Sequence, residues 1–331
     1  MSSKSLLLSS VVALLVTACG SKQYYTPQTI VSSVSTSSSE KIVNFNRAGA
    51  TLDNGKVLTR QGALKLKLED GYKFINGNSN GIVLSNKDGK CIVLKNGKTQ
   101  VIEFPKELIA GTIIENSLVY ILRDNNFGIY DLSKKSIVYN EKGEKVFSID
   151  TRVENPIQVE KLVVVPLLNG KLVVLNLKER KIVKEILVSS ESSLNNIIFL
   201  KRLKNTLIAS TPYKLIAINN QGRKEFKRDI SEVIIDDNSI FVFSKDGKIS
   251  KLDATLTIQD EKKFKFAHFS VATVYKDRVY ALDKQGYLIV TNKDFTKRKV
   301  YEFPEVDGYS FVSGGYIYYD GNKINLDNLN Y

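Results

Sequence analysis

The chain has 331 residues, a formal net charge of +13, one His, no Trp and two Cys. This length accommodates one large domain or two ordinary ones, and a hydrophobic share of 43% is enough to build a sizeable core. A zinc site made of His and Cys side chains needs several such ligands. The composition therefore excludes a metal site of that kind.

The first residues have the pattern of an export signal. Lys4 supplies a positive charge, and Leu6 to Val16 is apolar except for Ser9 and Ser10. A membrane-spanning helix needs about 20 apolar residues, so this run is too short to cross a bilayer. A charged start followed by a short apolar run is typical of a secretory signal peptide, which we place at residues 1–18.

The apolar run ends in Leu-Val-Thr-Ala-Cys-Gly, residues 15–20. Small residues before Cys19 resemble the processing box of bacterial lipoproteins. The resemblance implies cleavage before Cys19 and a multiply acylated cysteine, with palmitate as an expected acyl group. Several acyl chains give stable anchoring without a transmembrane helix. Gly20, in place of Asp, implies the periplasmic face of the outer membrane. An ordinary signal peptide with a chance Cys is the alternative.

Residues 19–40 read as a lipidated tether, because residues 20–40 are rich in Ser and such composition favours flexibility. Within the tether, Thr29–Val34 has the β-branched character of a strand. Cys91 lies in an apolar run and is interpreted as a buried structural residue. Once Cys19 is lipidated, Cys91 has no partner for an internal disulfide.

From Lys41 onward the chain reads as short strands joined by turns, and the same hairpin recurs. In each copy two apolar strands flank a turn, usually Asp-Gly or Asn-Gly, which supplies the positive φ that tight hairpins need. The turns centre on Gly55, Gly89, Gly128, Gly170, a degenerate Thr211–Lys214, Gly247, Gly286 and Gly321. A period near 40 residues with four strands per copy is typical of a β-propeller.

The repeats predict an all-β, eight-bladed β-propeller over residues 41–331. The expected blades are 41–70, 71–106, 107–150, 151–190, 191–229, 230–264, 265–304 and 305–331. The last blade is short by about one strand, and we expect Thr29–Val34 to complete it and so cover its edge. A seven-bladed ring is the alternative, if residues 41–70 complete the C-terminal blade. Ser190 to Asn196 is the best candidate for a helix, and it is short.

No catalytic, cofactor or metal site is predicted. His268 stands among apolar residues, where a lone His is more often a packing residue than a ligand. Asp236-Asp237 and Glu69-Asp70 are paired carboxylates of the kind that glycosidases use, but turns between strands also collect acidic residues. There is no Gly-x-Ser-x-Gly motif and no phosphate-binding Gly-rich loop.

Lys and Arg are spread over nearly all repeats. Lys commonly lines exposed strands and discourages edge-to-edge aggregation, so a solvated basic surface is one interpretation. Attraction to anionic lipid headgroups or to an acidic partner is the other. Nucleic acid is not an expected partner of an exported lipoprotein.

The repeats resemble quinoprotein-like (pyrroloquinoline-quinone-type) propellers. Quinone dehydrogenases of that group are longer and stack the cofactor on a Trp, which this chain lacks. The combination of lipobox, Ser-rich tether and cofactor-free propeller resembles the BamB-like propeller lipoproteins of the outer-membrane β-barrel assembly (BAM) machinery.

That resemblance covers nearly the whole chain and implies eight blades closed by an N-terminal strand. It also implies a non-enzymatic scaffold that binds the periplasmic domains of the central barrel subunit. No segment matches the family's partner-binding loop well enough to carry residues over. The alternatives are a periplasmic or surface propeller that binds carbohydrate or another ligand, and a degenerate propeller enzyme.

Overall fold

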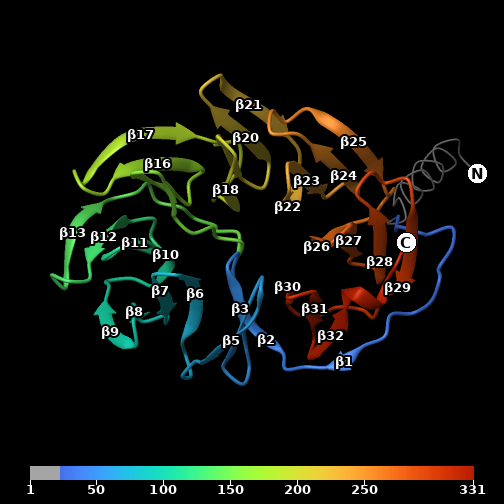
Figure 1. Ribbon diagram of the computed structural model, residues 1–331, viewed down its shortest axis with the longest axis horizontal. Coiled ribbons are helices and arrows are strands. Elements are labelled where there is room, and N and C mark those ends of the chain that lie inside the picture. The colour runs from blue at the N-terminus through green and yellow to red at the C-terminus, as the bar shows by residue number, and fades with distance from the viewer. Residues whose placement is uncertain (1–22) are drawn as a thin grey trace, which may run out of the picture.

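The computed structural model describes residues 23–331, and the expected signal peptide and Cys19 lie outside this range. Eight four-stranded antiparallel sheets are arranged as the blades of a ring (Figure 1). The predicted eight-bladed β-propeller is confirmed. The seven-bladed alternative is wrong, because β2–β5 form a blade of their own within residues 42–67.

In seven blades the strands follow chain order from the inside of the ring to the outside (Figure 1). Blades 1 to 4 consist of β2 (Ile42–Phe45), β3 (Gly49–Leu52), β4 (Lys56–Thr59) and β5 (Gly62–Lys67); β6 (Lys73–Asn78), β7 (Gly81–Ser85), β8 (Lys90–Lys95) and β9 (Lys98–Glu103); β10 (Leu108–Ile114), β11 (Ser117–Leu122), β12 (Phe127–Asp131) and β13 (Ser136–Glu141); β14 (Ile157–Val159), β15 (Leu162–Pro166), β16 (Lys171–Asn176) and β17 (Lys181–Leu187).

Blades 5 to 8 continue the series. They consist of β18 (Phe199–Leu203), β19 (Thr206–Ser210), β20 (Lys214–Asn219) and β21 (Gly222–Lys227); β22 (Ile230–Asp236), β23 (Ser239–Ser244), β24 (Lys248–Leu252) and β25 (Ile258–Lys263); β26 (Phe269–Tyr275), β27 (Arg278–Asp283), β28 (Tyr287–Asn292) and β29 (Arg298–Glu302); β30 (Ser310–Ser313), β31 (Tyr316–Tyr319), β32 (Asn322–Asn325) and β1 (Ser37–Ser38).

In six blades the repeated glycine sits in the turn between the second and third strands. Gly89 has φ +88°, and a Cβ there would lie 2.3 Å from the carbonyl oxygen of Phe104. The chain therefore needs glycine both for its backbone conformation and for close approach of the outer strand. Blade 5 makes the corresponding turn without glycine between β19 and β20, at the predicted degenerate copy. The prediction of a turn centred on Gly128 is wrong, because Gly128 lies within β12 and the turn of blade 3 spans residues 123–126, with Asn125 at φ +69°.

The hydrophobic core lies between blades, and each pair of neighbouring blades encloses one buried cluster. Cys91 on β8 is fully buried in the cluster between blades 2 and 3. Burial raises the pKa of its thiol to about 12, so the side chain remains a neutral thiol. The prediction of a structural cysteine is confirmed.

The ring closes through the N-terminal segment, but not through the predicted residues. β1 is the fourth strand of blade 8: Ser37 pairs with Lys323 and Ser38 with Asn322. The prediction that Thr29–Val34 completes the last blade is wrong. Residues 31–34 run parallel to β29 of blade 7, with hydrogen bonds from Val31 N to Val300 O (2.9 Å) and from Val34 N to Glu302 O (3.0 Å).

The physical reason is the length of the connection. β1 ends only a few residues before β2, so it passes directly from the rim of blade 8 to the inside of blade 1. Val34 is meanwhile buried in the cluster between blades 7 and 8. Tyr25 packs edge-on against Phe264 and Tyr287, with ring centroids 6.1 and 5.9 Å away. The segment therefore lies along the outside of the ring (Figure 1).

Helical structure is slight. Residues 190–196, the best helix candidate from sequence, contain bends and irregular backbone, and a 3-10 helix spans Leu326–Asn328. Within residues 23–331, no helix has the length and apolar character needed to cross a membrane.

Ring closure by β1 has a direct test. Ser39 N donates a 2.8 Å hydrogen bond to Gly321 O beside β1. Ser39→Pro removes this donor, and we expect it to lower the free energy of unfolding by about 1–3 kcal/mol. Ser39→Ala keeps the N–H group and is expected to change it by less than about 0.5 kcal/mol. Equal stability of the two variants in chemical denaturation would contradict closure at this point.

Candidate functional site in the central cavity

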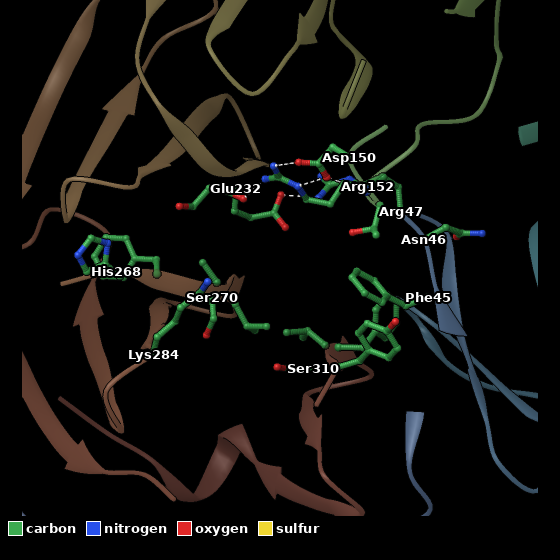
Figure 2. A pocket seen from close by; sticks show the side chains of 18 of the residues that line it. Phe45, Asn46, Arg47, Asp150, Arg152, Glu232, His268, Ser270, Lys284 and Ser310 are labelled. Carbon is green, nitrogen blue, oxygen red and sulfur yellow. Dashed lines mark hydrogen bonds and ion pairs between the residues drawn. The ribbon is translucent and has the colours of Figure 1, made fainter. Parts of the chain in front are cut away.

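A cavity of about 740 Å³ lies on the inner side of the ring, bounded by blades 1, 6, 7 and 8 and by the segment around residues 149–152. Figure 2 shows His268 and Lys284 on one wall, with Phe45 opposite them. Arg47, Asp150, Arg152 and Glu232 form a charged group along another side. The cavity therefore combines ionic and aromatic surfaces.

Arg47 joins blades from opposite parts of the ring. It lies in the turn between β2 and β3, and its Nη1 is 2.5 Å from Glu232 Oε1 on β22. Its Nε is 3.8 Å from Glu154 Oε2, in the connection that precedes β14. The guanidinium carbon also lies 5.6 Å from the ring centroid of Phe199 on β18. One side chain of blade 1 thus contacts blades 4, 5 and 6.

The cluster around Arg47 is largely removed from water. The side chains of Arg47, Glu154 and Glu232 are 10%, 12% and 15% exposed. Burial raises the pKa of Glu154 more than Arg47 lowers it. Burial also opposes ionisation of Glu232, but Arg47 and Arg60 outweigh that effect and hold its pKa below the usual range. Glu232 is therefore the firmly ionised partner of Arg47.

Arg60 shares the carboxylate of Glu232 at a greater distance. Its Nη2 lies 3.9 Å from Glu232 Oε2, and 37% of its side chain is exposed. Burial and the neighbouring charge of Arg47 lower the pKa of Arg60 to about 10. Its guanidinium carbon lies 4.7 Å from the ring centroid of Phe311 on β30. Arg60 thus carries a positive charge into the cavity with little direct neutralisation.

Arg152 is held by its own neighbour. Its Nε donates to Asp150 Oδ1 at 2.8 Å, and a second nitrogen pairs with Asp150 Oδ2. Another nitrogen donates to the carbonyl of Ser231, which ties the segment to β22. On the far side, Asn196 accepts from Asp150 N at 2.7 Å. The connection between blades 3 and 4 is therefore fixed at the cavity wall.

The candidate residues identified from the sequence lie in different environments in the structure. His268 lines the cavity and is exposed rather than packed in the core, since it lies in the connection before β26. Asp236 pairs with Lys293 at 2.5 Å, and Asp237 is 3.8 Å from the same nitrogen, so this acidic pair links blades 6 and 7. Glu69 and Asp70 are exposed turn residues. No group of three or more potential metal ligands occurs within residues 23–331.

Sequence analysis missed one exposed feature. Phe147, in the connection between β13 and β14, is 96% exposed. The connection is anchored before it, where Glu144 accepts from Asn169 Nδ2 at 2.9 Å and pairs with Lys171 Nζ at 2.6 Å. The Asp150–Asn196 contact anchors it on the other side. The connection is thus fixed on both sides of Phe147, and the phenyl side chain of Phe147 is exposed to solvent.

No protein-family model matches the chain. In sequence it is 25% identical, over 87% of its length, to the plasminogen-binding protein PgbB of Helicobacter pylori strains J99 and 26695. The chain spans 63% and 62% of the length of these relatives.

Among solved structures it is similar to BamB from Moraxella catarrhalis, with a TM-score of 0.65, 15% identity, and 88% of this chain and 98% of that chain covered. It is also similar to the C-terminal WD40 domain of Sif2, with a TM-score of 0.62, 10% identity, and 89% and 98% of the two chains covered. At these identities the similarities show the fold alone. The chain therefore has a BamB-like propeller fold.

The buried cluster makes Arg47 important for stability. Arg47→Met leaves Glu154 and Glu232 without their shared partner, and we expect unfolding to require about 3–5 kcal/mol less free energy at pH 7. Arg202 forms an exposed pair with Glu160 at 3.6 Å, so Arg202→Met is a matched control with an expected change of at most about 1 kcal/mol.

The pH dependence follows from the direction of the Glu232 shift. A carboxyl group with a lowered pKa stabilises the fold above its unfolded pKa of about 4.3, and this contribution is lost as pH falls through the folded value. The difference between wild type and Arg47→Met should therefore shrink in acid. A difference that grows as the pH falls below about 4.3 would be inconsistent with this cluster.

Proposed function

We propose that this chain is a lipid-anchored, non-enzymatic scaffold that assists assembly and insertion of β-barrel proteins into the outer membrane. The fold carries the proposal: a closed eight-bladed ring similar to BamB over 98% of that chain. The lipobox-like residues before Cys19 support anchoring at the membrane. The expected partners are the periplasmic domains of a β-barrel assembly subunit.

Phe147 is the side chain best placed to anchor such a partner. A ring that is 96% exposed gains free energy when a partner removes it from water. Aromatic residues are frequent energetic centres of protein interfaces. Because the connection is fixed on both sides of Phe147, little ordering cost is expected on binding.

The anchor also orients the ring. Tyr25 is docked on blades 6 and 7 through Phe264 and Tyr287, and it follows Cys19 by six residues. Six residues span at most about 22 Å. Acylation of Cys19 would therefore hold this side of the ring close to the bilayer. Lys263, Lys265 and Arg298 lie on the same two blades and are exposed, which suits an anionic lipid surface.

A second candidate is binding of plasminogen or another host protein at the cell surface. The sequence match to PgbB over 87% of this chain favours it. The two functions differ in the side of the outer membrane that the propeller faces. Accessibility of the protein to protease added to intact cells therefore separates them.

The anchor is tested by Cys19→Ala. Since the acyl groups are the proposed attachment, we expect the variant to leave the membrane fraction and to appear in the soluble periplasmic fraction. Labelling with a radioactive fatty acid should mark the wild type and not the variant. A variant that stays in membranes, beside a wild type without label, would reject lipidation at this residue.

The scaffold role is tested by co-purification from gently solubilised cells. Wild type should recover barrel-assembly subunits, and its depletion should lower porin levels in the outer membrane. Phe147→Ser should reduce recovery by about tenfold or more, as for an interface hot spot. The control is Val101→Ser, which changes an apolar side chain that is 58% exposed on β9. Recovery of plasminogen alone, with unchanged porins, would favour the second candidate.

A further inference from the structure

The central cavity carries more positive than negative charge. Its charged lining residues are Arg47, Arg60, Arg152, Lys245 and Lys284, against Asp150 and Glu232. Both carboxylates are already engaged, since Asp150 pairs with Arg152 and Glu232 with Arg47. The remaining cations therefore face the cavity without an equivalent counter-charge.

The equivalent cation of blade 3 is paired with a carboxylate, unlike the cavity-lining lysines of blades 6 and 7. In blade 3, Arg123 N donates to Glu107 O at 2.9 Å, and the buried Glu107 carboxylate pairs with the Arg123 side chain. Lys245 N donates to Asp229 O in blade 6, and Lys284 N donates to His268 O in blade 7, so these two lysines occupy the position of Arg123.

The buried, ion-paired carboxylate of blade 3 has no buried equivalent in the other two blades. In blade 6 its position is taken by the exposed Asp229, and in blade 7 by His268. Within residues 23–331, the ion pairs of blades 6 and 7 involve other cations, so neither lysine forms a direct ion pair. The charge of Lys245 acts only at longer range on Asp150, where it helps to lower the pKa of that carboxyl. Lys245 instead lies 5.6 Å from the ring centroid of Tyr213, which is uncharged. Two adjacent repeats thus carry a lysine without a direct ion pair at the position where blade 3 has a buried ion pair.

The opposite wall is aromatic. Phe45 and Tyr309 are in contact, with ring centroids 5.2 Å apart, and Phe311 lies under Arg60. A guanidinium over an aromatic ring keeps its hydrogen-bond donors free at its edge for a planar anion. The cavity volume of about 740 Å³ lies within the range of sites that hold small organic ligands.

We infer that this cavity binds a small organic anion, a carboxylate joined to a flat apolar group. The carboxylate meets Arg60 above Phe311, and the apolar group lies against Phe45 and Tyr309. Lys245 and Lys284 on the facing wall add to the positive potential that attracts the anion. This site is separate from Phe147, so it concerns a ligand of the propeller itself and stands whether or not the scaffold role is correct.

The single histidine provides a direct reporter. His268 lines the cavity and is the only His in the sequence. Its imidazole NMR resonances are therefore assigned without ambiguity in protein purified without a histidine tag. The probe is 2-naphthoate, and the neutral control of nearly equal shape is 2-naphthamide. We expect 2-naphthoate to shift the His268 resonances saturably and to bind about tenfold more tightly than 2-naphthamide, the size of one charge-assisted contact.

Charge-removing variants complete the test. Arg60→Gln, and separately Lys245→Gln combined with Lys284→Gln, should each weaken 2-naphthoate about tenfold or more. Lys224→Gln, on the exposed strand β21, makes the same kind of change outside the cavity and should have no effect. The double lysine variant changes exposed side chains, so it remains informative if Arg60→Gln fails to fold. Equal affinity for acid and amide, unshifted His268 resonances, or unchanged binding by the variants would overturn the inference.

Discussion

Arg47 carries a guanidinium group from blade 1 to carboxylates of blades 4 and 6, and the organisation of the ring centre depends on this contact. The hydrophobic clusters, in contrast, join only neighbouring blades. A largely buried ion pair across the ring must stay satisfied, since separation would leave Glu232 ionised in a poorly hydrated site. Glu232 pairs closely with Arg47, at 2.5 Å, and only at 3.9 Å with Arg60. The positive charge of Arg60 is therefore less neutralised and is available in the cavity. The same contact thus joins distant blades and sets the polarity of the cavity beside it.

The N-terminal segment links this ring to its proposed place in the cell. Residues 31–34 pair with β29, and β1 completes blade 8 before the chain enters blade 1. Ring closure and the proposed anchoring would therefore use one continuous stretch of backbone. If Cys19 is acylated as proposed, a force on the lipid would be transmitted to the edges of blades 7 and 8. A scaffold held in this way would present a constant side to the membrane and leave the Phe147 connection available to partners.

Local signals predicted the blades well because each hairpin is specified by its own residues. Glycines such as Gly89 are required by positive φ and by close contact, so their spacing reproduces the blade boundaries. The closing strand was misplaced because Ile30 and Val31 have strand-forming side chains, whereas β1 consists of two serines whose pairing is determined by the nearby edge of β32. Arg47 and Phe147 could not be identified from periodicity. Their roles arise from contacts across the ring and from the anchoring of a connection, which no local pattern encodes.

Proximity of partners to Phe147 in living cells tests the scaffold proposal most directly. A photo-crosslinking amino acid at position 147 of the full-length protein should form adducts with barrel-assembly subunits, identified by mass spectrometry. The same amino acid at position 101, an exposed site on β9, should form few or none. Absence of barrel-assembly adducts at position 147, or the same adducts at both positions, would contradict a specific scaffold role for this surface.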